Sequence, residues 1–377
     1  MLNGQSTLPV RTEIVIVGAG LAGLSCALLL AQAGAKVVVL ESNSTLGDCV
    51  VGRGAGLAQL GLGEHPAQLV SAIGFEDAMA LYTLSVRSLQ MLDPIAQWSA
   101  RGELWCASMD REDEAVTRSA ACLSQMGLSV ELLTGTELAD RLGLSSFPVG
   151  WSQPFGGSLA PRALIDDLAL KAVSAGVHLQ LDFDFLELTR SEEGLCFQGS
   201  QGQCLAELAV FANGWKSATI EPWFEQKVFP VRAQHYWQRG GTPLVCAGRT
   251  QHGYASWAPM RDGVVVSGCR WGSAHMEVGE WEDVLNDKIS GHLAKFMERF
   301  IPLPEGDPVE WTSVMDFSCD GLPFLGPLPG QARKIACVGF GGQDLGLAMA
   351  SAEAVVEGIL NGIAPAIPHR LHASRLI

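Results

Sequence analysis

The chain has 377 residues, of which 48% are hydrophobic and 17% charged, enough for two ordinary globular domains with buried cores. With 25 basic against 40 acidic residues the formal net charge is −15, which argues against a nucleic-acid surface and against binding to anionic lipid. No segment reaches the ~18 apolar residues of a membrane helix and no signal peptide is evident, so we expect a cytoplasmic protein. Ten scattered cysteines without a CxxC pattern indicate free thiols and no metal site.

The most informative segment is residues 14–41, which predicts a strand, a glycine turn, a helix and a second strand. The β-branched run Ile14–Val17 is typical of a buried parallel strand. Gly18 allows a tight turn, Gly20 lets the backbone approach a pyrophosphate, and Gly23 permits close packing of helix on strand. The N–H groups at the start of the helix favour phosphate charge.

The second strand, Lys36–Leu40, ends at Glu41, which lies about 20 residues past the glycines. A carboxylate at this place binds ribose hydroxyls and repels a 2′-phosphate. The whole unit therefore predicts a site for the ADP part of a dinucleotide cofactor. Leu21 and Ala22 at the helix start and Ser42 beside the acid are included in this site.

The middle of the chain is expected to be mostly helical at first. After a second glycine cluster at Val50–Gly63, the apolar spacing predicts helices over much of residues 66–142. Residues 151–190 are expected to run as loop, helix and strand. The helix is predicted at Pro161–Ser174, with proline in its first turn, and the strand at Val177–Leu181.

The second half of the chain begins strand-like and ends in a helix. Arg261–Gly263 is a hairpin-type turn between predicted strands at Tyr254–Met260 and Val264–Gly268. Residues 276–300 carry apolar side chains at near-helical spacing, which predicts one amphipathic helix packed on the core. A last helix is predicted at Leu345–Leu360.

Four separated motifs together resemble the D-amino-acid-oxidase-like superfamily of FAD enzymes, which includes glycine oxidase, sarcosine oxidase and γ-glutamylputrescine oxidase. The similarity runs nearly from end to end. The first motif is the GAGLAG turn with Glu41, and the second is the loop Gly52–Gly56, which is similar to the family's GRNGG type. The third is the pair VFANGWKS (210–217) and VFPVRAQ (228–234), which is similar to the family's ATG and PVRGQ. The fourth is Asp320–Pro327 followed by Val338–Gly346.

The resemblance implies an α/β fold with two domains. A Rossmann-like FAD-binding domain would be assembled from residues 1–63, 150–218 and 315–377. A substrate domain built on an antiparallel sheet with helices would comprise residues 64–149 and 219–314. The partner it implies is a small-molecule amine substrate, and the oligomeric state, a homo-oligomer included, is left open.

The later motifs are expected to contact FAD as well. Besides the first motif, the expected cofactor contacts are Arg53, Gly54, Ala55, Gly56, Leu57, Phe185, Ala212, Asn213, Gly214, Gly339, Gly341, Gly342, Gln343, Asp344 and Leu345. The last glycine loop opens a helix and so aims N–H groups at the flavin pyrimidine edge, where negative charge accumulates on reduction. Gln343 replaces a frequent family histidine and can still hydrogen-bond the ring or the substrate.

The family oxidises a C–N bond, usually by hydride transfer from a neutral amine carbon to flavin, and the imine product hydrolyses. Met315 occupies the place of the arginine that grips the substrate carboxylate in glycine oxidase. Either the substrate is an amine without an α-carboxylate at that place, or another cation such as Arg270 binds the carboxylate. Tyr254 is expected to orient the substrate by its hydroxyl, and Asp316, if it faces the pocket, would attract a second cationic group.

Two further departures concern the flavin. The strand Val264–Gly268 lacks the lysine that helps oxygen react in sarcosine oxidase, so the acceptor is either oxygen or a quinone-like compound. The cysteine that links flavin covalently in that enzyme would fall at about Ser313, so non-covalent FAD is expected. Four histidines lie apart from any acid pattern and are expected to be structural or surface residues: His65, His178, His235 and His275.

Two further functions stay open on the sequence. A 2-hydroxy-acid dehydrogenase in the same fold would need a base for the hydroxyl proton, such as a histidine close to the flavin. A non-catalytic flavoprotein subunit gains some support because Met315 and Val266 replace functional residues.

Overall fold

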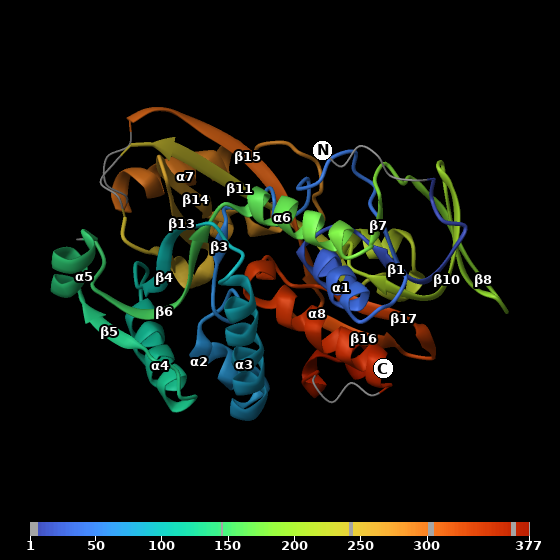
Figure 1. The fold of residues 1–377 in the computed structure, drawn as a ribbon. Coiled ribbons are helices and arrows are strands. Elements are labelled where there is room, and N and C mark those ends of the chain that lie inside the picture. The colour runs from blue at the N-terminus through green and yellow to red at the C-terminus, as the bar shows by residue number, and fades with distance from the viewer. Residues whose placement is uncertain (1–6, 145, 241–243, 301–304, 363–366, 377) are drawn as a thin grey trace. The chain divides into compact units, whose positions relative to one another are not determined.

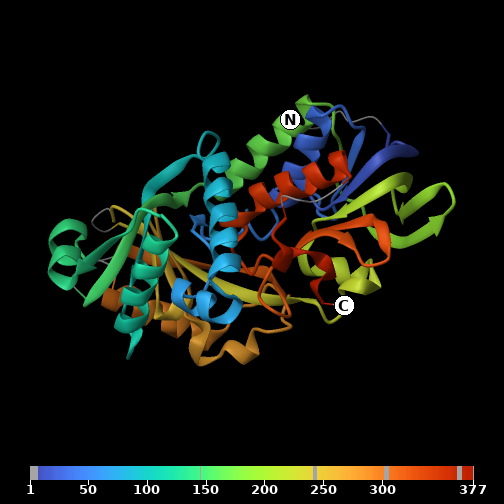
Figure 2. The same ribbon diagram turned by 90° about the horizontal axis from the view of Figure 1, so that it is seen from below.

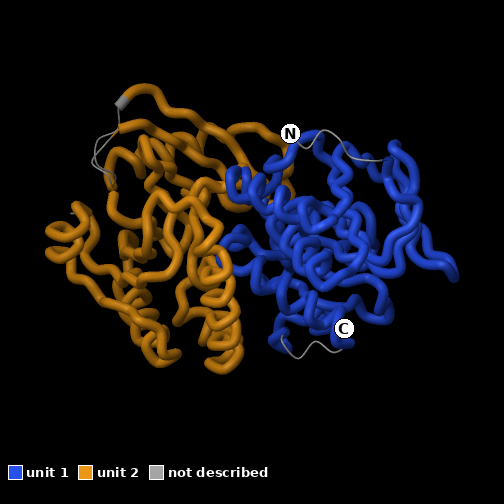
Figure 3. The backbone as a smooth tube through the Cα atoms, in the orientation of Figure 1, with its two compact units in different colours: residues 1–52, 162–230, 315–377 blue, residues 53–161, 231–314 orange. Residues whose placement is uncertain are grey.

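The computed structural model describes residues 7–144, 146–240, 244–300, 305–362 and 367–376. The chain divides into two compact units (Figure 3). Unit 1 comprises residues 1–52, 162–230 and 315–377, and unit 2 comprises residues 53–161 and 231–314.

The described part of unit 1 contains an eight-stranded sheet with the order β16-β17-β10-β1-β2-β7, to which a hairpin of β8 and β9 is added along β10. Neighbouring strands from β17 to β7 are parallel, and β16 is antiparallel to β17. Its strands are β1 (Arg11–Val17), β2 (Val37–Leu40), β7 (His178–Gln180), β8 (Phe185–Ser191), β9 (Gly194–Gly199), β10 (Gly202–Phe211), β16 (Phe324–Leu328) and β17 (Gln331–Val338). The strands β1 and β2 confirm the first predicted strand pair.

Three helices accompany this sheet: α1 (Leu21–Gln32), α6 (Pro161–Ser174) and α8 (Asp344–Asn361). The helices α1 and α8 pack against each other and lie side by side in both ribbon views (Figure 1, Figure 2). The helices predicted at Pro161–Ser174 and Leu345–Leu360 are confirmed. Most of α1 and α8 is buried, as expected for helices that are apolar on nearly every side.

In unit 2 the described residues form a nine-stranded sheet with the order β15-β11-β14-β13-β12-β4-β6-β3, with β5 paired to β6. Its strands are β3 (Leu57–Ala58), β4 (Trp98–Cys106), β5 (Glu131–Thr134), β6 (Val149–Leu159), β11 (Val228–Arg239), β12 (Ala247–Thr250), β13 (Ala255–Met260), β14 (Gly263–Gly268) and β15 (Glu305–Ser318). The pairing of β12 with β4 is parallel, whereas β13 and β14 form the predicted hairpin.

The helices of unit 2 are α2 (Pro66–Ile73), α3 (Phe75–Leu92), α4 (Glu112–Gln125), α5 (Gly135–Leu142) and α7 (Asp287–Phe300). Helix α7 packs on β14 and buries its apolar stripe in a core that also contains Trp257. No helix among the described residues is long and apolar enough to cross a membrane. All ten cysteines are free, which confirms the expectation of free thiols.

Three predictions of local structure were wrong. The stretch 66–142 contains the strands β4 and β5 besides its helices, and residues 151–159 belong to β6 and not to a loop. The helix predicted at 276–300 begins only at Asp287, after Asn286 accepts the Lys288 N–H at 3.1 Å and so caps the start. The first part of the predicted apolar stripe is exposed, since Trp281 retains 59% of its accessible surface.

The unit boundaries differ from those expected. From the sequence we placed the first three at 63/64, 149/150 and 218/219, whereas the units meet at 52/53, 161/162 and 230/231. Strand β6 explains the second difference, because it pairs with β3, β4 and β5 and therefore belongs to unit 2.

Candidate functional site

One edge of the unit 1 sheet gathers four segments that are distant in sequence. The strands β1, β2, β10 and β17 are parallel neighbours, so their carboxyl ends lie at the same edge. The residues that directly follow these strands are Gly18, Glu41, Ala212 and Gly339. In open parallel sheets, ligands bind outside the carboxyl ends of the strands.

The three glycines of the first turn have different surroundings. Gly18 has φ +100°, and a Cβ there would lie 2.8 Å from the Ala212 oxygen. A Cβ on Gly23 would lie 2.0 Å from the Gly18 oxygen, so helix α1 needs glycine to pack on the turn. Gly20 has φ −76°, and a Cβ there would meet no heavy atom of the described residues within 4 Å. The fold thus requires glycine at two positions and leaves open space at the third.

Glu41 is held beside this turn by backbone donors. Its Oε2 accepts the Ala19 N–H at 2.7 Å, and its Oε1 accepts the Asn43 N–H at 2.9 Å. A carboxylate offers about four acceptor positions, so capacity remains for ribose hydroxyls. The hydroxyl of Ser42 lies 3.5 Å from Glu41 Oε1.

Two helices begin at this edge. The first helical bond of α1 runs from the Leu24 N–H to the Gly20 oxygen at 2.9 Å, so the N–H groups of Leu21, Ala22 and Gly23 precede it. Helix α8 begins at Asp344 after a loop in which Gly339, Gly341 and Gly342 all have positive φ. Both helix starts present backbone donors, the arrangement that binds anionic groups. An open position at Gly20, a fixed acid and two helix starts fit the diphosphate and ribose of a dinucleotide.

Met315 and Asp316 lie against the glycine segments of this edge. A Cβ on Gly342 would lie 2.5 Å from Met315 Sδ, so the thioether packs on the loop that opens α8. Asp316 is buried, accepts the Gly339 N–H through Oδ2 and contributes its backbone oxygen to the Gly341 N–H at 2.8 Å. The side chain of Asp316 therefore supports the loop.

Two buried carboxyl groups shape the electrostatics at the start of α8. Burial raises the pKa of Asp316 to about 6. Burial and the neighbouring Asp316 charge raise the pKa of Asp344 well above its usual range. In the described part of the chain Asp344 Oδ2 has no hydrogen-bond partner. Sequence reasoning named Asp344 as a cofactor contact but missed this pair, because burial and proximity arise only in the folded unit.

The predicted cofactor-binding residues at the start of unit 2 form hydrogen bonds and an ion pair with other residues of that unit. The Arg53 side chain forms an ion pair with Asp283 and donates from Nε to the Thr312 carbonyl oxygen at 3.1 Å. The backbone carbonyl of Arg53 accepts the Trp311 Nε1–H at 2.7 Å. Gly56 directly precedes strand β3, which begins at Leu57, and its carbonyl accepts the Leu159 N–H at 2.9 Å. Gly54 and Ala55, which lie between Arg53 and Gly56, are half-buried. This loop is thereby fixed to β6 and β15.

Arg270 and Tyr254 lie together. The Arg270 guanidinium carbon is 5.1 Å from the centroid of the Tyr254 ring. Burial lowers the pKa of Arg270, although a guanidinium stays charged at any physiological pH. A partly desolvated cation beside a hydroxyl-bearing ring can bind a carboxylate.

Phe185 and His235 pack against neighbouring side chains of their own units. Phe185 packs edge-on against Phe183 and Phe197, with ring centroids 4.8 and 6.1 Å away, in the apolar cluster of unit 1. This packing holds the partly buried Phe185 ring, and its contact with the cofactor stays a prediction. His235 lies between the hydroxyls of Ser267 at 2.7 Å and Ser313 at 2.8 Å, and burial lowers its pKa to about 3. These contacts agree with the expected structural role of this histidine, which stays a prediction.

The remaining predicted contacts belong to unit 1. The Ala212 N–H donates to the Val17 oxygen at 2.9 Å, and Asn213 Oδ1 accepts the Ser217 hydroxyl at 2.6 Å just before Gly214. Gln343 stands at the N-cap of α8, and Leu345 is buried in its first turn. These residues all lie at or directly after the strand edge.

A parallel sheet with a fingerprint turn, a fixed acid and two helix starts defines a Rossmann-like dinucleotide-binding protein. Residues 13–358 match the family described as FAD dependent oxidoreductase (DAO), and the chain belongs to that family. It is an FAD-dependent oxidoreductase with a Rossmann-like FAD domain and a second domain.

The curated relatives include a bifunctional protein. The chain is 28% identical over 333 residues to the tRNA 5-methylaminomethyl-2-thiouridine biosynthesis bifunctional protein MnmC of Pseudomonas putida, covering 84% of this chain and 48% of the relative. The chain thus spans about half the length of the curated relatives it matches.

Solved structures show the same fold. Glycine oxidase from Geobacillus kaustophilus superposes with a TM-score of 0.77 at 19% identity, covering 98% of this chain and 100% of that one. L-proline dehydrogenase from P. horikoshii superposes with a TM-score of 0.80 at 18% identity, covering 98% of both chains.

Proposed function

We propose that this protein oxidises the C–N bond of a small amine or amino acid. The substrate loses a C–H hydrogen with its electron pair and an N–H proton, a C=N bond forms, and water hydrolyses this imine to a carbonyl compound and ammonia or a smaller amine. Bound FAD would supply the two-electron oxidation, with oxygen or a quinone-like compound as the final acceptor. The chain itself supplies binding, orientation and exclusion of water.

The observation that carries the substrate class is Met315 on the loop that opens α8. Its apolar thioether packs on Gly342, at the place where the resemblance to glycine oxidase puts an arginine. A thioether cannot pair with a carboxylate, whereas it accepts apolar bodies well. We therefore infer that the preferred substrate is a primary or secondary amine without an α-carboxylate at this position.

Within unit 1, Gln343 supports the same reaction. It stands at the N-cap of α8, beside Gly342, with an amide that can donate and accept. A neutral side chain there can hydrogen-bond an unprotonated amine without fixing a proton on it. Because a neutral amine carbon can lose hydride directly, no separate general base is needed.

Arg270 offers the competing arrangement. It is a partly desolvated cation beside Tyr254, so an α-carboxylate could bind in unit 2 and not near Met315. An amino acid would then remain a substrate despite the missing arginine. Kinetics of matched amines and amino acids separate the two arrangements.

A second candidate function follows from the curated relatives. MnmC of Pseudomonas putida is named for 5-methylaminomethyl-2-thiouridine, whose side chain is a secondary amine without an α-carboxylate. Because the name gives this group as what is made, the second candidate substrate is a tRNA-borne amine from which it is formed. The net charge of −15 opposes binding of a tRNA phosphate backbone by this chain alone, so we place the free amine first.

Oxidation of a hydroxy acid and a non-catalytic role receive less support. A 2-hydroxy-acid dehydrogenase needs a base, yet both ring nitrogens of His235 are engaged by hydroxyls and its pKa is lowered to about 3. A non-catalytic subunit would show no flavin reduction by any amine.

Flavin bleaching without oxygen tests these proposals. The FAD-loaded protein is mixed with amines, α-amino acids of matched size, 2-hydroxy acids and unfractionated tRNA, with dithionite giving the fully bleached reference. We expect small amines to bleach the flavin fastest. Bleaching by 2-hydroxy acids alone, by tRNA alone, or by nothing in the panel would each refute the primary proposal. Admitting oxygen afterwards shows whether oxygen is the acceptor.

A further inference from the structure

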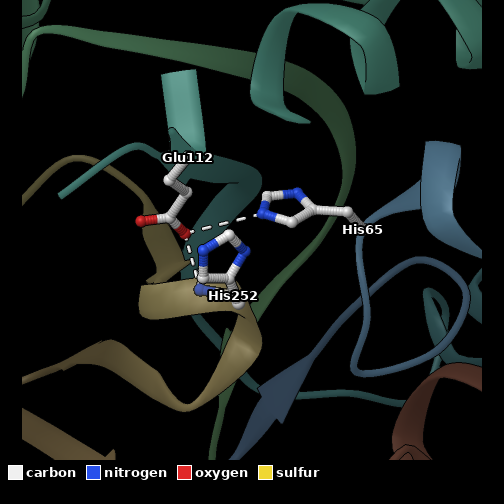
Figure 4. Close-up of side chains that lie close together, drawn as sticks. All are labelled: His65, Glu112 and His252. Carbon is white, nitrogen blue, oxygen red and sulfur yellow. Dashed lines mark hydrogen bonds and ion pairs between the residues drawn. The ribbon is translucent and has the colours of Figure 1, made fainter. Parts of the chain in front are cut away.

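Three side chains from distant parts of the sequence converge in unit 2 (Figure 4). His65 directly precedes α2, Glu112 is the first residue of α4, and His252 lies in the short 3-10 turn Gln251–Gly253. His65 Nε2 is 3.6 Å from Glu112 Oε1, and one ligand atom from each residue lies within 4.8 Å of the others. The three side chains point toward one another.

The imidazole of His65 is fully buried, and its two ring nitrogens have no hydrogen-bond partner among the described residues. The Nδ1 atom of His252 is in the same situation. Buried polar atoms without partners are rare in native proteins and point to a missing ligand.

Glu112 supplies the negative charge of the cluster. Its Oε2 accepts the N–H groups of Ser108 at 2.8 Å and Met109 at 3.1 Å, and its Oε1 accepts the His252 N–H at 2.6 Å. Burial acts to raise the pKa of Glu112, but His65 and these backbone donors hold it below its usual range. The carboxylate is thus ionised and fixed in position, and Oε1 retains a lone pair.

The surroundings hold the ligands in place before any ion binds. Arg249 forms a buried pair with Glu103 and donates to the Leu60 and Leu62 oxygens at 2.8 and 2.6 Å, which fixes the loop that leads to His65. The His65 ring stacks on Trp105 with a centroid separation of 4.2 Å.

The backbone beside two of the ligands is strained. Gln251 and His252 have φ 55° and 54°, and Arg111, which precedes Glu112, has φ 62°. Left-handed backbone is strained at residues other than glycine, and such strain is found at ligand clamps.

We propose that His65, Glu112 and His252 bind a divalent transition-metal ion, with Zn²⁺ as the best fit. Two imidazoles and one carboxylate form a borderline donor set that suits zinc and not calcium or magnesium. Metal–ligand distances of about 2.0–2.1 Å put tetrahedral ligand atoms roughly 3.3 Å apart. His65 Nε2 and Glu112 Oε1 are 3.6 Å apart, and the three ligand atoms lie within 4.8 Å of one another, so small movements would bring them around an ion. The ion would compensate the buried charge of Glu112, bind one nitrogen of each histidine and join three segments of unit 2. It would overturn the expectation that this chain binds no metal.

The test measures metal stoichiometry in the FAD-loaded protein. The protein is treated with a chelator, dialysed against Zn²⁺ and then against metal-free buffer, and analysed by mass spectrometry of the elements. We expect one zinc per chain, and X-ray absorption at the zinc edge should show imidazole ligands. Glu112→Gln, which keeps the side-chain shape, and His252→Ala should each bind zinc at least about a hundredfold more weakly, because loss of a supporting partner alone costs about 10–100-fold.

His292→Ala is the matched control, since this histidine stacks on Trp271 in the same unit but outside the cluster. It should retain one zinc per chain. Flavin content and near-ultraviolet circular dichroism of every variant show that the fold is kept. No stoichiometric uptake of Zn²⁺, Ni²⁺, Cu²⁺ or Mn²⁺ by the unmodified protein would overturn the proposal, and so would equal zinc binding by folded Glu112→Gln. Either result leaves amine oxidation untouched, because flavin bleaching is measured separately.

Discussion

Gly20 and Gly23 lie in one turn, yet each is glycine for a different reason. A Cβ on Gly23 would lie 2.0 Å from the Gly18 oxygen, whereas a Cβ on Gly20 would meet no described atom within 4 Å. The fold therefore tolerates a side chain at Gly20. A bound diphosphate would occupy that space.

We predict that Gly20→Val folds but loses FAD. The φ of −76° is accessible to valine, and the new methyl groups would occupy the approach path of the pyrophosphate. The ratio of flavin to protein absorbance should fall at least about tenfold, which corresponds to roughly 1.4 kcal/mol or more of cofactor affinity. Circular dichroism should remain native. A fully loaded Gly20→Val protein would contradict the assignment of this turn.

The residues of the candidate site divide into those that sequence can reveal and those that it cannot. Glycine motifs and Glu41 are recognisable because turn geometry and spacing along one βαβ unit impose them locally. The contact of Met315 with Gly342 and the convergence of His65, Glu112 and His252 depend on pairings between distant segments. No spacing rule predicts such contacts, so these residues became visible only in the fold.

At the scale of elements, strength of local signal decided what could be predicted. Helix α6 begins at a proline, and an Asp-Gly turn joins the strands of the hairpin β13–β14. Residues next to each other in sequence therefore mark the ends of both elements. Strand β4 was missed because its pairing partner β6 lies far along the chain, so no local turn marks the pairing. Tertiary pairing overrode the helical spacing there.

Packing of α1 on its turn gives a prediction at this scale. Gly23→Ala should destabilise the protein by about 1–3 kcal/mol, the usual cost of overpacking, because its Cβ would overlap the Gly18 oxygen and push the helix away. Denaturant unfolding followed by circular dichroism measures this change. Gly20→Ala is the matched control and should change stability much less. Equal stability of both variants would refute the close-packing role of Gly23.

The start of α8 gives a pH prediction. Asp316 and Asp344 have raised pKa values in the folded state, so the folded protein binds protons more tightly than the unfolded chain. Their contribution to stability is therefore fully present below the unfolded pKa of about 4 and is lost as pH rises through about 6 and beyond. Relative to Asp344→Asn, the unmodified protein should lose roughly 1 kcal/mol or more between pH 5 and pH 8.

Thermal unfolding of the FAD-loaded proteins across this pH range provides the measurement. The exposed Asp167 on α6 offers the control, because Asp167→Asn removes the same charge from the surface. Its unfolding curve should follow the unmodified protein at every pH. A stability difference between Asp344→Asn and the unmodified protein that does not change with pH would disprove the linkage.

At the scale of the whole molecule, the positive charge available to activate oxygen decides how fast oxygen reoxidises the reduced flavin. Val266 is buried in β14 where the resemblance places an oxygen-activating lysine, and Arg53 is paired with Asp283. We therefore predict that oxygen reoxidises the reduced flavin more slowly than substrate reduces it. A quinone-like dye should then raise turnover. Stopped-flow mixing with air-saturated buffer measures both rates, and reoxidation faster than reduction would establish a true oxidase.

Substrate class is the property that the whole site determines. A charged hydrogen bond is worth about 1.5–3 kcal/mol, so replacing the carboxylate-binding arginine by Met315 should weaken binding of simple α-amino acids about tenfold or more. Benzylamine should therefore reduce the flavin faster than phenylglycine, and Met315→Arg should shift that preference toward the acid at least about tenfold. Anaerobic stopped-flow reduction of matched amine and acid pairs gives both ratios. If phenylglycine is the better substrate of the unmodified protein and Arg270→Ala abolishes its binding, the carboxylate is bound in unit 2 and Met315 does not set the substrate class.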